Sequence, residues 1–262
     1  MATIAGFPGA SMGQSRAPWR TARGRLKVMT GVVVIAAVAT GLTAASSASA
    51  RKPTVVRPVQ ELARLLTSHE VVSRLHTHPS RIGTVRASRP ITGGQTVLPV
   101  VGRTTTRDGV HWLRVMVPGR PNGMKGWIKQ RGTVLTTTSW HVAIRTSSRR
   151  VLVYRHGVLV RSFPAVVGKP STPTPHGRFF VEENVRMPPG SAGAPFALAL
   201  SARSNVLHRF EGGPGQIAIH GVANLGGTPG TAISHGCVRL ASGSIRWLAA
   251  RIAPGMPVTI TS

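Results

Sequence analysis

Cysteine is almost absent from this sequence: Cys237 is the only one among 262 residues. An intramolecular disulfide is therefore excluded. So is a lipoprotein anchor, which requires a cysteine at the cleavage site of the leader. If the chain is exported, its lone thiol is open to oxidation, which makes a reactive role more plausible than usual. The alternative is a small, buried, inert hydrophobic side chain.

Acidic residues are also scarce, with six Asp and Glu against 33 Lys and Arg and a formal net charge of +27. Aromatic residues make up 5% of the chain and the basic residues are dispersed, so we expect no nucleic-acid partner. No His-Glu-x-x-His spacing occurs, which leaves a metal hydrolase without ligands. The expected anionic partners are wall polymers, peptide carboxylates and lipid headgroups.

The first fifty residues are typical of an export signal. Basic residues between Arg16 and Lys27 precede an apolar run over residues 28–45, and Ala48-Ser49-Ala50 has the small-x-small pattern of a cleavage site. Removal of residues 1–50 leaves a formal charge of +22. An uncleaved membrane anchor through residues 28–45 is the alternative, because about 17–25 apolar residues cross a bilayer. In both cases we expect an extracytoplasmic protein, at the cell wall.

Two domains are expected in the rest of the chain. Residues 51–79 combine prolines with the helical spacing of Val59, Leu62, Leu65 and Leu66, which predicts a tether with one short helix. Residues 80–138 contain short β-rich runs separated by glycine turns, which predict a small β-barrel. The runs that begin at Trp112 and at Gly126-Trp127-Ile128 resemble the SH3-like modules that flank many bacterial wall enzymes.

Residues 139–262 are predicted to form a mainly β domain, sandwich-like or barrel-like, with one packed helix. The helix is indicated by Ile245, Leu248, Ala249 and Ile252, with Ser242 or Ser244 as its N-cap and Pro254-Gly255 as its stop. Strands are predicted at residues 140–146, 151–154, 158–163, 196–200 and 257–260, and the second and third of these form a hairpin closed by His156-Gly157.

Two histidines lie close to Cys237 in the sequence. His220 follows the apolar run 216–219, and His235 belongs to the segment Ser234-His235-Gly236-Cys237. A thiol with a pKa of about 8.5 is only slightly ionised at neutral pH and needs a base, for which His220 is the candidate. Main-chain amides around Gly236 and Cys237 could stabilise an oxyanion.

An acceptor that orients the imidazole of His220 is also expected. Glu211 is the one acidic residue within thirty positions, and Asn224 is the one nearby amide. A main-chain carbonyl would serve equally well, because the protonated ring nitrogen needs only an acceptor. The residues themselves leave the three choices open.

Taken together, these segments resemble a known family. His220, a spacer, Ser234-His235-Gly236-Cys237, an apolar residue and Arg239 resemble the signature of the L,D-transpeptidase catalytic domain, or YkuD domain. Residues 172–179 (TPTPHGRF) match its upstream Thr-Pro-x-Gly-x-Phe element, although His176 stands where another residue is common. The resemblance covers about residues 140–260.

The resemblance implies a role for each matching residue. Cys237 would be the nucleophile and His220 the general base, with the carbonyl of Gly221 orienting it. The implied oxyanion and substrate contacts are Ser234, His235, Gly236 and Arg239, of which Arg239 would meet a substrate carboxylate. No metal or organic cofactor is implied.

The implied reaction joins two peptidoglycan stem peptides, a donor and an acceptor. The thiol attacks the carbonyl of the third, diamino acid residue of a tetrapeptide stem and releases the terminal D-Ala. The side-chain amine of a second stem then resolves the thioester into a 3→3 cross-link. An L,D-carboxypeptidase, which uses water instead, shares the acyl-enzyme and no motif separates the two. A non-catalytic wall-binding protein, acting through the SH3-like module, is the alternative outside the enzymes.

Overall fold

The computed structural model describes residues 56–75 and 80–262. The predicted export signal and the possible anchor at residues 28–45 lie outside the described residues. Within the described part of the chain, no helix is both long enough and apolar enough to cross a membrane.

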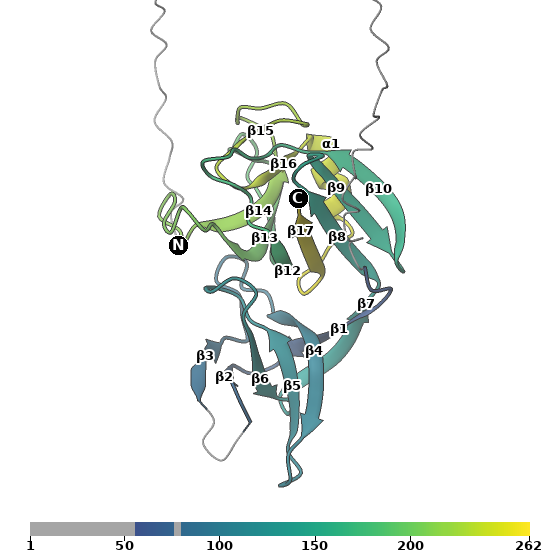
Figure 1. Cartoon of the computed structure of the whole chain (residues 1–262), viewed down its shortest axis with the longest axis vertical. Helices are drawn as coiled ribbons and strands as arrows, with labels where there is room; N and C mark the ends of the chain where they lie inside the picture. Colours follow the sequence, from purple (N-terminus) through teal and green to yellow (C-terminus); the bar gives the residue numbers. More distant parts are fainter. Residues whose placement is uncertain (1–55, 76–79) are drawn as a thin grey trace, which may run out of the picture. The chain divides into compact units, whose positions relative to one another are not determined.

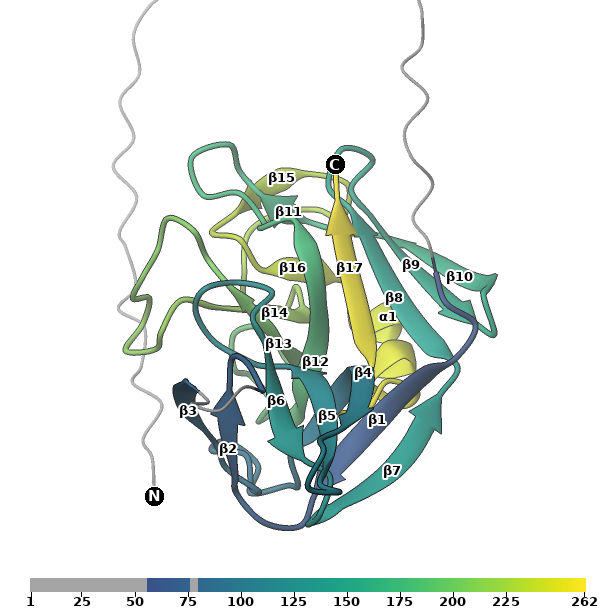
Figure 2. The same ribbon diagram turned by 60° about the horizontal axis from the view of Figure 1, so that its bottom comes forward.

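The first part of the described chain forms an antiparallel sheet of seven strands in the order β3-β2-β6-β5-β4-β1-β7 (Figures 1 and 2). Its strands are β1 (Gln60–Leu65), β2 (His69–Val72), β3 (Arg81–Val85), β4 (Val97–Thr105), β5 (His111–Met116), β6 (Lys125–Lys129) and β7 (Thr133–Thr138). The β character predicted for residues 80–138 is confirmed. The resemblance of this small sheet to an SH3-like module stays a prediction.

The tether with a short helix, predicted for residues 51–79, is wrong where the structure describes them. β1 lies between β4 and β7, so both of its edges are hydrogen-bonded. Leu62, Ala63 and Leu65 are buried, whereas Val59 and Leu66 are half exposed. The leucine spacing imitates a helix because an inner strand buries consecutive residues on both of its faces and loses the polar alternation of a half-buried strand.

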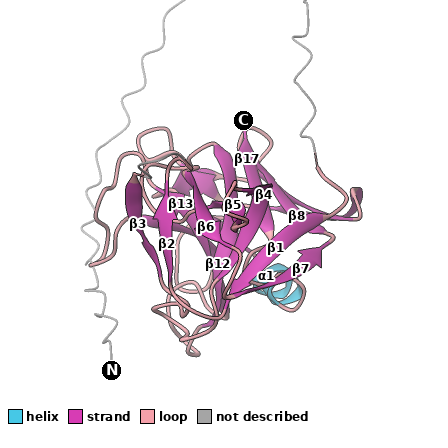
Figure 3. Ribbon diagram, turned by 90° about the horizontal axis from the view of Figure 1, so that it is seen from below, coloured by secondary structure: helices cyan, strands magenta, loops and turns pink. Residues whose placement is uncertain are grey.

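The second part of the chain forms an eight-stranded sheet in the order β10-β9-β8-β17-β12-β13-β14-β16. One helix, α1 (Ser242–Ala249), packs against it, and the described residues are otherwise strand and loop (Figure 3). This is the mainly β fold with one packed helix that the sequence predicts. The strands are β8 (Trp140–Arg145), β9 (Arg150–Arg155), β10 (Val158–Pro164), β12 (Gly177–Arg186), β13 (Phe196–Arg203), β14 (Gln216–Gly221), β16 (Val238–Leu240) and β17 (Pro257–Thr261), with β11 (Val167–Gly168) and β15 (Ala232–Ser234) as a separate short pair.

The predicted hairpin and helix are both present, with one correction at the helix start. β9 and β10 pair across the turn at His156-Gly157, where both residues have positive φ. The N-cap of α1 is Ala241, which makes no side-chain capping bond, so neither predicted serine is the cap. Ile245 and Leu248 are fully buried, as their spacing predicts.

Strand β12 contributes side chains to two hydrophobic cores. Phe179 and Val181 pack in the core of the large sheet, whereas Phe180 packs in the core of the small sheet. This division follows from the alternation of side chains along a strand. Glu182, on the side of Phe180, forms ion pairs with Arg89 and Arg203.

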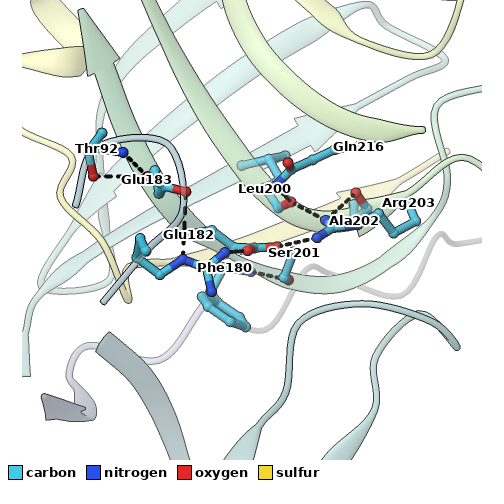
Figure 4. Close-up of polar contacts among 10 residues, drawn as sticks. Thr92, Phe180, Glu182, Glu183, Leu200, Ser201, Ala202, Arg203 and Gln216 are labelled. Atoms are coloured by element: carbon cyan, nitrogen blue, oxygen red, sulfur yellow. Dashed lines mark hydrogen bonds and ion pairs between the residues drawn. The ribbon is translucent and has the colours of Figure 1, made fainter. Parts of the chain in front are cut away.

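The polar contacts continue at the next residue of β12. The carboxylate of Glu183 accepts hydrogen bonds from the amide and the hydroxyl of Thr92, at 2.7 and 2.9 Å (Figure 4). Both glutamates are almost completely buried. The ion pair of Arg89 with Glu182 and the hydrogen bonds of Thr92 with Glu183 tie the loop at residues 89–92 to the large sheet. Removal of one partner of a buried ion pair is strongly destabilising.

Candidate functional site

The thiol of Cys237 lies over one face of β14. Gln216, Ala218 and His220 alternate along this strand and are half-buried, while the residues between them are buried. The Sγ atom of Cys237 is 4.0 Å from the carbonyl oxygen of Gln216, and the amide of Ala218 donates toward it. β16, which follows Cys237 directly, pairs in parallel with β14 and sets Arg239 opposite His220. His220 lies on the same face of β14 as Ala218, and side chains two residues apart on one face of a strand are about 7 Å apart.

The ring of His220 has a fixed tautomer. Its Nδ1 atom is 2.8 Å from the carbonyl oxygen of Gly221. A carbonyl only accepts, so Nδ1 carries the proton and Nε2 keeps its lone pair. Of the three acceptors that the sequence left open, the main-chain carbonyl makes this contact. Glu211 is exposed, and the side-chain amide of Asn224 donates to the carbonyl of Gly190.

The loop before β13 encloses the same ring. A Cβ atom at Gly193, where φ is +83°, would lie only 2.7 Å from Nδ1 of His220, so any larger residue there would displace the imidazole. Burial and, to a smaller extent, the positive charge of Arg239 lower the pKa of His220 to about 4, although the hydrogen bond with Gly221 acts in the opposite direction. The imidazole is therefore neutral at neutral pH and can accept a proton.

The thiol itself is not preformed as a thiolate. Burial raises the pKa of Cys237 above its usual value, and the Ala218 amide and the charge of Arg239 offset this only in part. A protonated thiol beside a neutral imidazole needs proton transfer during attack rather than before it.

Ser234 and Gly236 shape the turn that presents Cys237. The hydroxyl of Ser234 donates to the carbonyl of Cys237 at 2.6 Å and accepts from the amide of Gly236 at 3.1 Å. Ser234 is fully buried, so its hydroxyl holds the turn from inside. Gly236 has φ +119°, and a Cβ there would lie 3.0 Å from Cδ1 of Ile217. Its amide is already bonded within the turn.

Two threonines from the upstream element buttress this turn. The hydroxyl of Thr174 donates to the carbonyl of Gly236 at 2.8 Å and accepts from the amide of Gly168 at 2.9 Å. The hydroxyl of Thr172 donates to the carbonyl of Ser234 at 3.0 Å. Both threonines are buried. Sequence reasoning noted this element only through its resemblance to the family, and the hydrogen bonds give it a physical function.

Arg239 and His235 have opposite surroundings. Arg239 is 9% exposed, and its Nη1 donates to the carbonyl of Gly226, while its buried Nε has no hydrogen-bond partner among the described residues. Burial lowers the pKa of its guanidinium. His235 is exposed, and its ring lies 5.3 Å from that of Phe210. The guanidinium that the sequence assigned to a substrate carboxylate is thus bonded to the glycine-rich loop.

The loop over residues 204–215, which carries Phe210, is held by side chains of the small sheet. Arg120 donates to the carbonyls of Ser204, Leu207 and Pro214, at 2.7, 3.5 and 3.3 Å. Asn122 exchanges two hydrogen bonds with the main chain of Arg203, just before the loop. The sequence marked residues 121–123 only as a turn, and nothing in it indicated this long-range contact.

No cluster of metal ligands accompanies these groups. Within residues 56–75 and 80–262, no three His, Cys, Asp or Glu side chains are grouped so that they could hold a metal ion.

Comparison with known proteins points to one family. The L,D-transpeptidase catalytic domain (YkuD) matches residues 139–260. The YkuD protein of Bacillus licheniformis is 30% identical over 125 residues, which are 48% of this chain and 67% of that protein. L,D-transpeptidase 1 of Mycobacterium tuberculosis is 29% identical over 126 residues, which are 44% of this chain and 47% of that protein.

Solved structures of the same type are also similar. An L,D-transpeptidase from Mycobacterium smegmatis aligns with a TM-score of 0.37 at 15% identity, over 58% of this chain and 91% of that one. The sequence match spans both histidines, the cysteine turn and the threonine element that supports it. The chain therefore belongs to the L,D-transpeptidase catalytic domain family, whose members are enzymes that act on peptidoglycan.

Proposed function

We propose that this protein cross-links peptidoglycan stem peptides by L,D-transpeptidation, through a thioester on Cys237. The observation that carries the proposal is the position of the lone thiol over the β14 face that bears His220, whose Nε2 lone pair is free to accept a proton. The high pKa of Cys237 and the low pKa of His220 favour general-base catalysis over a preformed ion pair.

Acylation begins when Sγ of Cys237 attacks the carbonyl carbon of the third residue of a tetrapeptide stem. Nε2 of His220 takes the thiol proton as the S–C bond forms, and the carbonyl π electrons move onto oxygen. Because the Gly236 amide is bonded to Ser234, we assign the oxyanion to the amides of His235 and Cys237. The tetrahedral intermediate collapses, the bond to D-Ala breaks, and the imidazolium returns the proton to its amine.

The thioester is then resolved by the side-chain amine of a second stem. The amine attacks the same carbonyl carbon, His220 takes one of its protons, and the S–C bond breaks to give an amide cross-link. The proton returns to the thiolate of Cys237. Water in place of the amine would give a carboxypeptidase, so the fate of the thioester distinguishes these two reactions.

The other site residues position the reacting groups. Gly221 orients the base through its carbonyl, and Ser234 and Gly236 keep the turn in shape. Arg239 acts as a fixed positive charge beside Cys237, and a shift of the glycine-rich loop would release its guanidinium to a substrate carboxylate. The excess of basic residues supports an extracytoplasmic site in an anionic wall.

Mass spectrometry of the products tests the proposal. The purified protein is incubated with disaccharide tetrapeptides, and we expect a cross-linked dimer that has lost one D-Ala. Cys237→Ser, a matched change of one atom, should give neither dimer nor acyl-enzyme. A tripeptide without dimer would indicate the carboxypeptidase. An unmodified substrate with no acylated wild-type protein would overturn the assignment of Cys237.

A further inference from the structure

The edge strand of the large sheet exposes a continuous aliphatic segment. β10 is the outermost strand, and Val158, Leu159 and Val160 are 66, 49 and 43% exposed. The pairing with β9 shifts register between Leu159 and Arg161, so Val160 has no partner on β9 and forms a β-bulge. Native edge strands usually carry charges, prolines or bulges that prevent pairing with other strands, and Arg161, Pro164 and the bulge have this effect in β10. The aliphatic side chains of Val158, Leu159 and Val160 remain exposed beside them and form an apolar surface that another apolar phase could cover.

Tryptophan and arginine side chains surround this segment. The guanidinium of Arg155 lies 5.4 Å from the ring centre of Trp140, and those of Arg161 and Arg251 lie 5.3 and 4.2 Å from that of Trp247. The two tryptophan rings pack edge to face at 6.3 Å. Tryptophan and arginine beside exposed aliphatic residues are the combination found where proteins meet the headgroup region of a bilayer.

No acidic residue balances these arginines. None of the six Asp and Glu of the chain falls within residues 139–181 or 212–262, which contribute β8, β9, β10, β17 and α1. The strands of this part of the sheet carry Arg145, Arg150, Arg155 and Arg161. The surface thus has an uncompensated positive charge, which is complementary to anionic headgroups.

The length of the connecting chain limits the distance between this hairpin and the apolar run at residues 28–45. A Cβ atom at Gly157, in the hairpin turn, would lie 3.6 Å from Cγ of Pro58. Twelve residues, 46–57, separate Pro58 from the end of the run. Even fully extended, this segment spans at most about 45 Å. If the run stays in a membrane, the hairpin can therefore reach the bilayer surface but cannot move further from it than about 45 Å.

We propose that the β9–β10 hairpin docks the protein on an anionic lipid bilayer. Val158, Leu159 and Val160 enter the boundary between headgroups and acyl chains, and the arginines contact lipid phosphates. This goes beyond the transpeptidase reaction and does not depend on it. An anionic wall polymer would attract the arginines but has no use for the aliphatic residues, and a second copy paired edge to edge would bring two positive surfaces together.

A fluorescent probe on the hairpin tests the proposal in the full chain. The environment-sensitive dye NBD is attached at Leu159→Cys in a Cys237→Ser background, and the matched control carries it at Ile91→Cys, which is 56% exposed in the loop between β3 and β4. Both proteins are placed in nanodiscs with and without phosphatidylglycerol. We expect the Leu159 probe to shift to the blue and to be quenched at least about twofold more than the control by lipids spin-labelled near the headgroup.

The quenching is then compared between anionic and neutral discs and between the wild-type arginines and their variants. Arg155→Gln with Arg161→Gln should reduce the quenching in anionic discs, and about 0.5 M salt should do the same, because it screens exposed charges. Equal quenching at both sites, or equal quenching in neutral and anionic discs, overturns the proposal. A blue shift without lipid that grows with protein concentration would instead identify a second copy as the partner.

Discussion

The turn at residues 234–237 and the loop at residues 204–215 border the same thiol, but different parts of the chain hold them. Thr172 and Thr174, from the large sheet's own domain, support the turn. Arg120 and Asn122, from the small sheet, hold the loop and its start. One side of the site is therefore supported from within the residues that match the family, while the other depends on residues of this chain outside the match.

The largest difference is expected between substitutions of the two histidines near Cys237. His220→Ala should slow acylation of Cys237 by about a hundredfold or more, within the range for loss of a general base. His235→Ala should cost much less, because alanine keeps the main-chain amide and removes only the contact with Phe210. A carbapenem, whose β-lactam carbonyl we expect the thiol of Cys237 to attack, serves as the acylating probe. Stopped-flow kinetics and intact mass measure the acylation rate of both variants.

Folding must be compared in the same experiment, since the half-buried imidazole of His220 also packs against Gly193. Circular dichroism should give the same spectrum for both variants. A greater loss for His235→Ala, with His220→Ala still active, would reverse the two roles.

Removal of the threonine hydroxyls that support the turn at residues 234–237 should have the next largest effect. Thr174→Val leaves the carbonyl of Gly236 and the amide of Gly168 without their partner, and unsatisfied buried groups cost about 1–3 kcal/mol each. Thr172→Val removes one bond and should cost less. Denaturant unfolding measures the change in stability. Equal effects, or none, would mean that the threonines do not hold the turn.

Loss of the contacts between Arg120 and the loop at residues 204–215 should have a smaller effect on the acylation rate. Arg120→Ala removes donors to three carbonyls of the loop at residues 204–215. We expect acylation to slow by about threefold to tenfold, because misplacement of a site by a fraction of an ångström costs part of its proximity advantage. Hydrogen exchange should rise in this loop and not in the turn.

Arg107→Ala is the matched control, since it removes the same charge from an exposed position of the small sheet. It should leave both the acylation rate and the exchange unchanged. If Arg120→Ala behaved in the same way, the small sheet would have no part in holding the site.

The smallest expected effect is the change of the acylation rate with pH. With the pKa of His220 at about 4, the base stays unprotonated at pH 5.5, and acylation should vary less than about twofold between pH 7.5 and 5.5. A histidine with an ordinary pKa of about 6.5 would lose roughly tenfold over this interval. A tenfold fall in the carbapenem acylation rate would show that the burial of His220 does not set its titration.

The low pKa of His220 also makes the stability of the folded protein depend on pH. Below pH 6.5 the unfolded chain binds protons at His220 and at His141, whose pKa burial also lowers to about 4, before the folded protein does. The free energy of unfolding should therefore decrease as pH falls from 6.5 to 4. Thermal unfolding at pH 7 and pH 5 measures this.

Local patterns allowed much of the large sheet to be predicted. The β9–β10 hairpin follows from two apolar runs around His156-Gly157, and α1 follows from the spacing of Ile245 and Leu248. That His220 can come beside Cys237 is a prediction from the Gly-rich connection and the resemblance to the family. In each case, residues close in sequence or in a known motif carry the signal.

Other features depend on partners that the sequence does not reveal. β1 becomes a strand because β4 and β7 pair with both of its edges. Arg120 is one of 33 basic residues, and only the folded chain distinguishes it by bringing loop carbonyls within its reach. The low pKa of His220 is likewise a property of burial, which a linear pattern cannot state.

The two-sided strand β12 has a consequence for how the protein unfolds. Phe180 belongs to the core of the small sheet, and Arg89 of the small sheet neutralises the buried carboxylate of Glu182. A fragment that began at residue 139 would expose Phe180 and remove Arg89, leaving Glu182 with Arg203 as its remaining ion-pair partner among the described residues. We therefore expect the described parts of both sheets to melt in one cooperative transition, with the boundary of the family match lying inside a single folding unit.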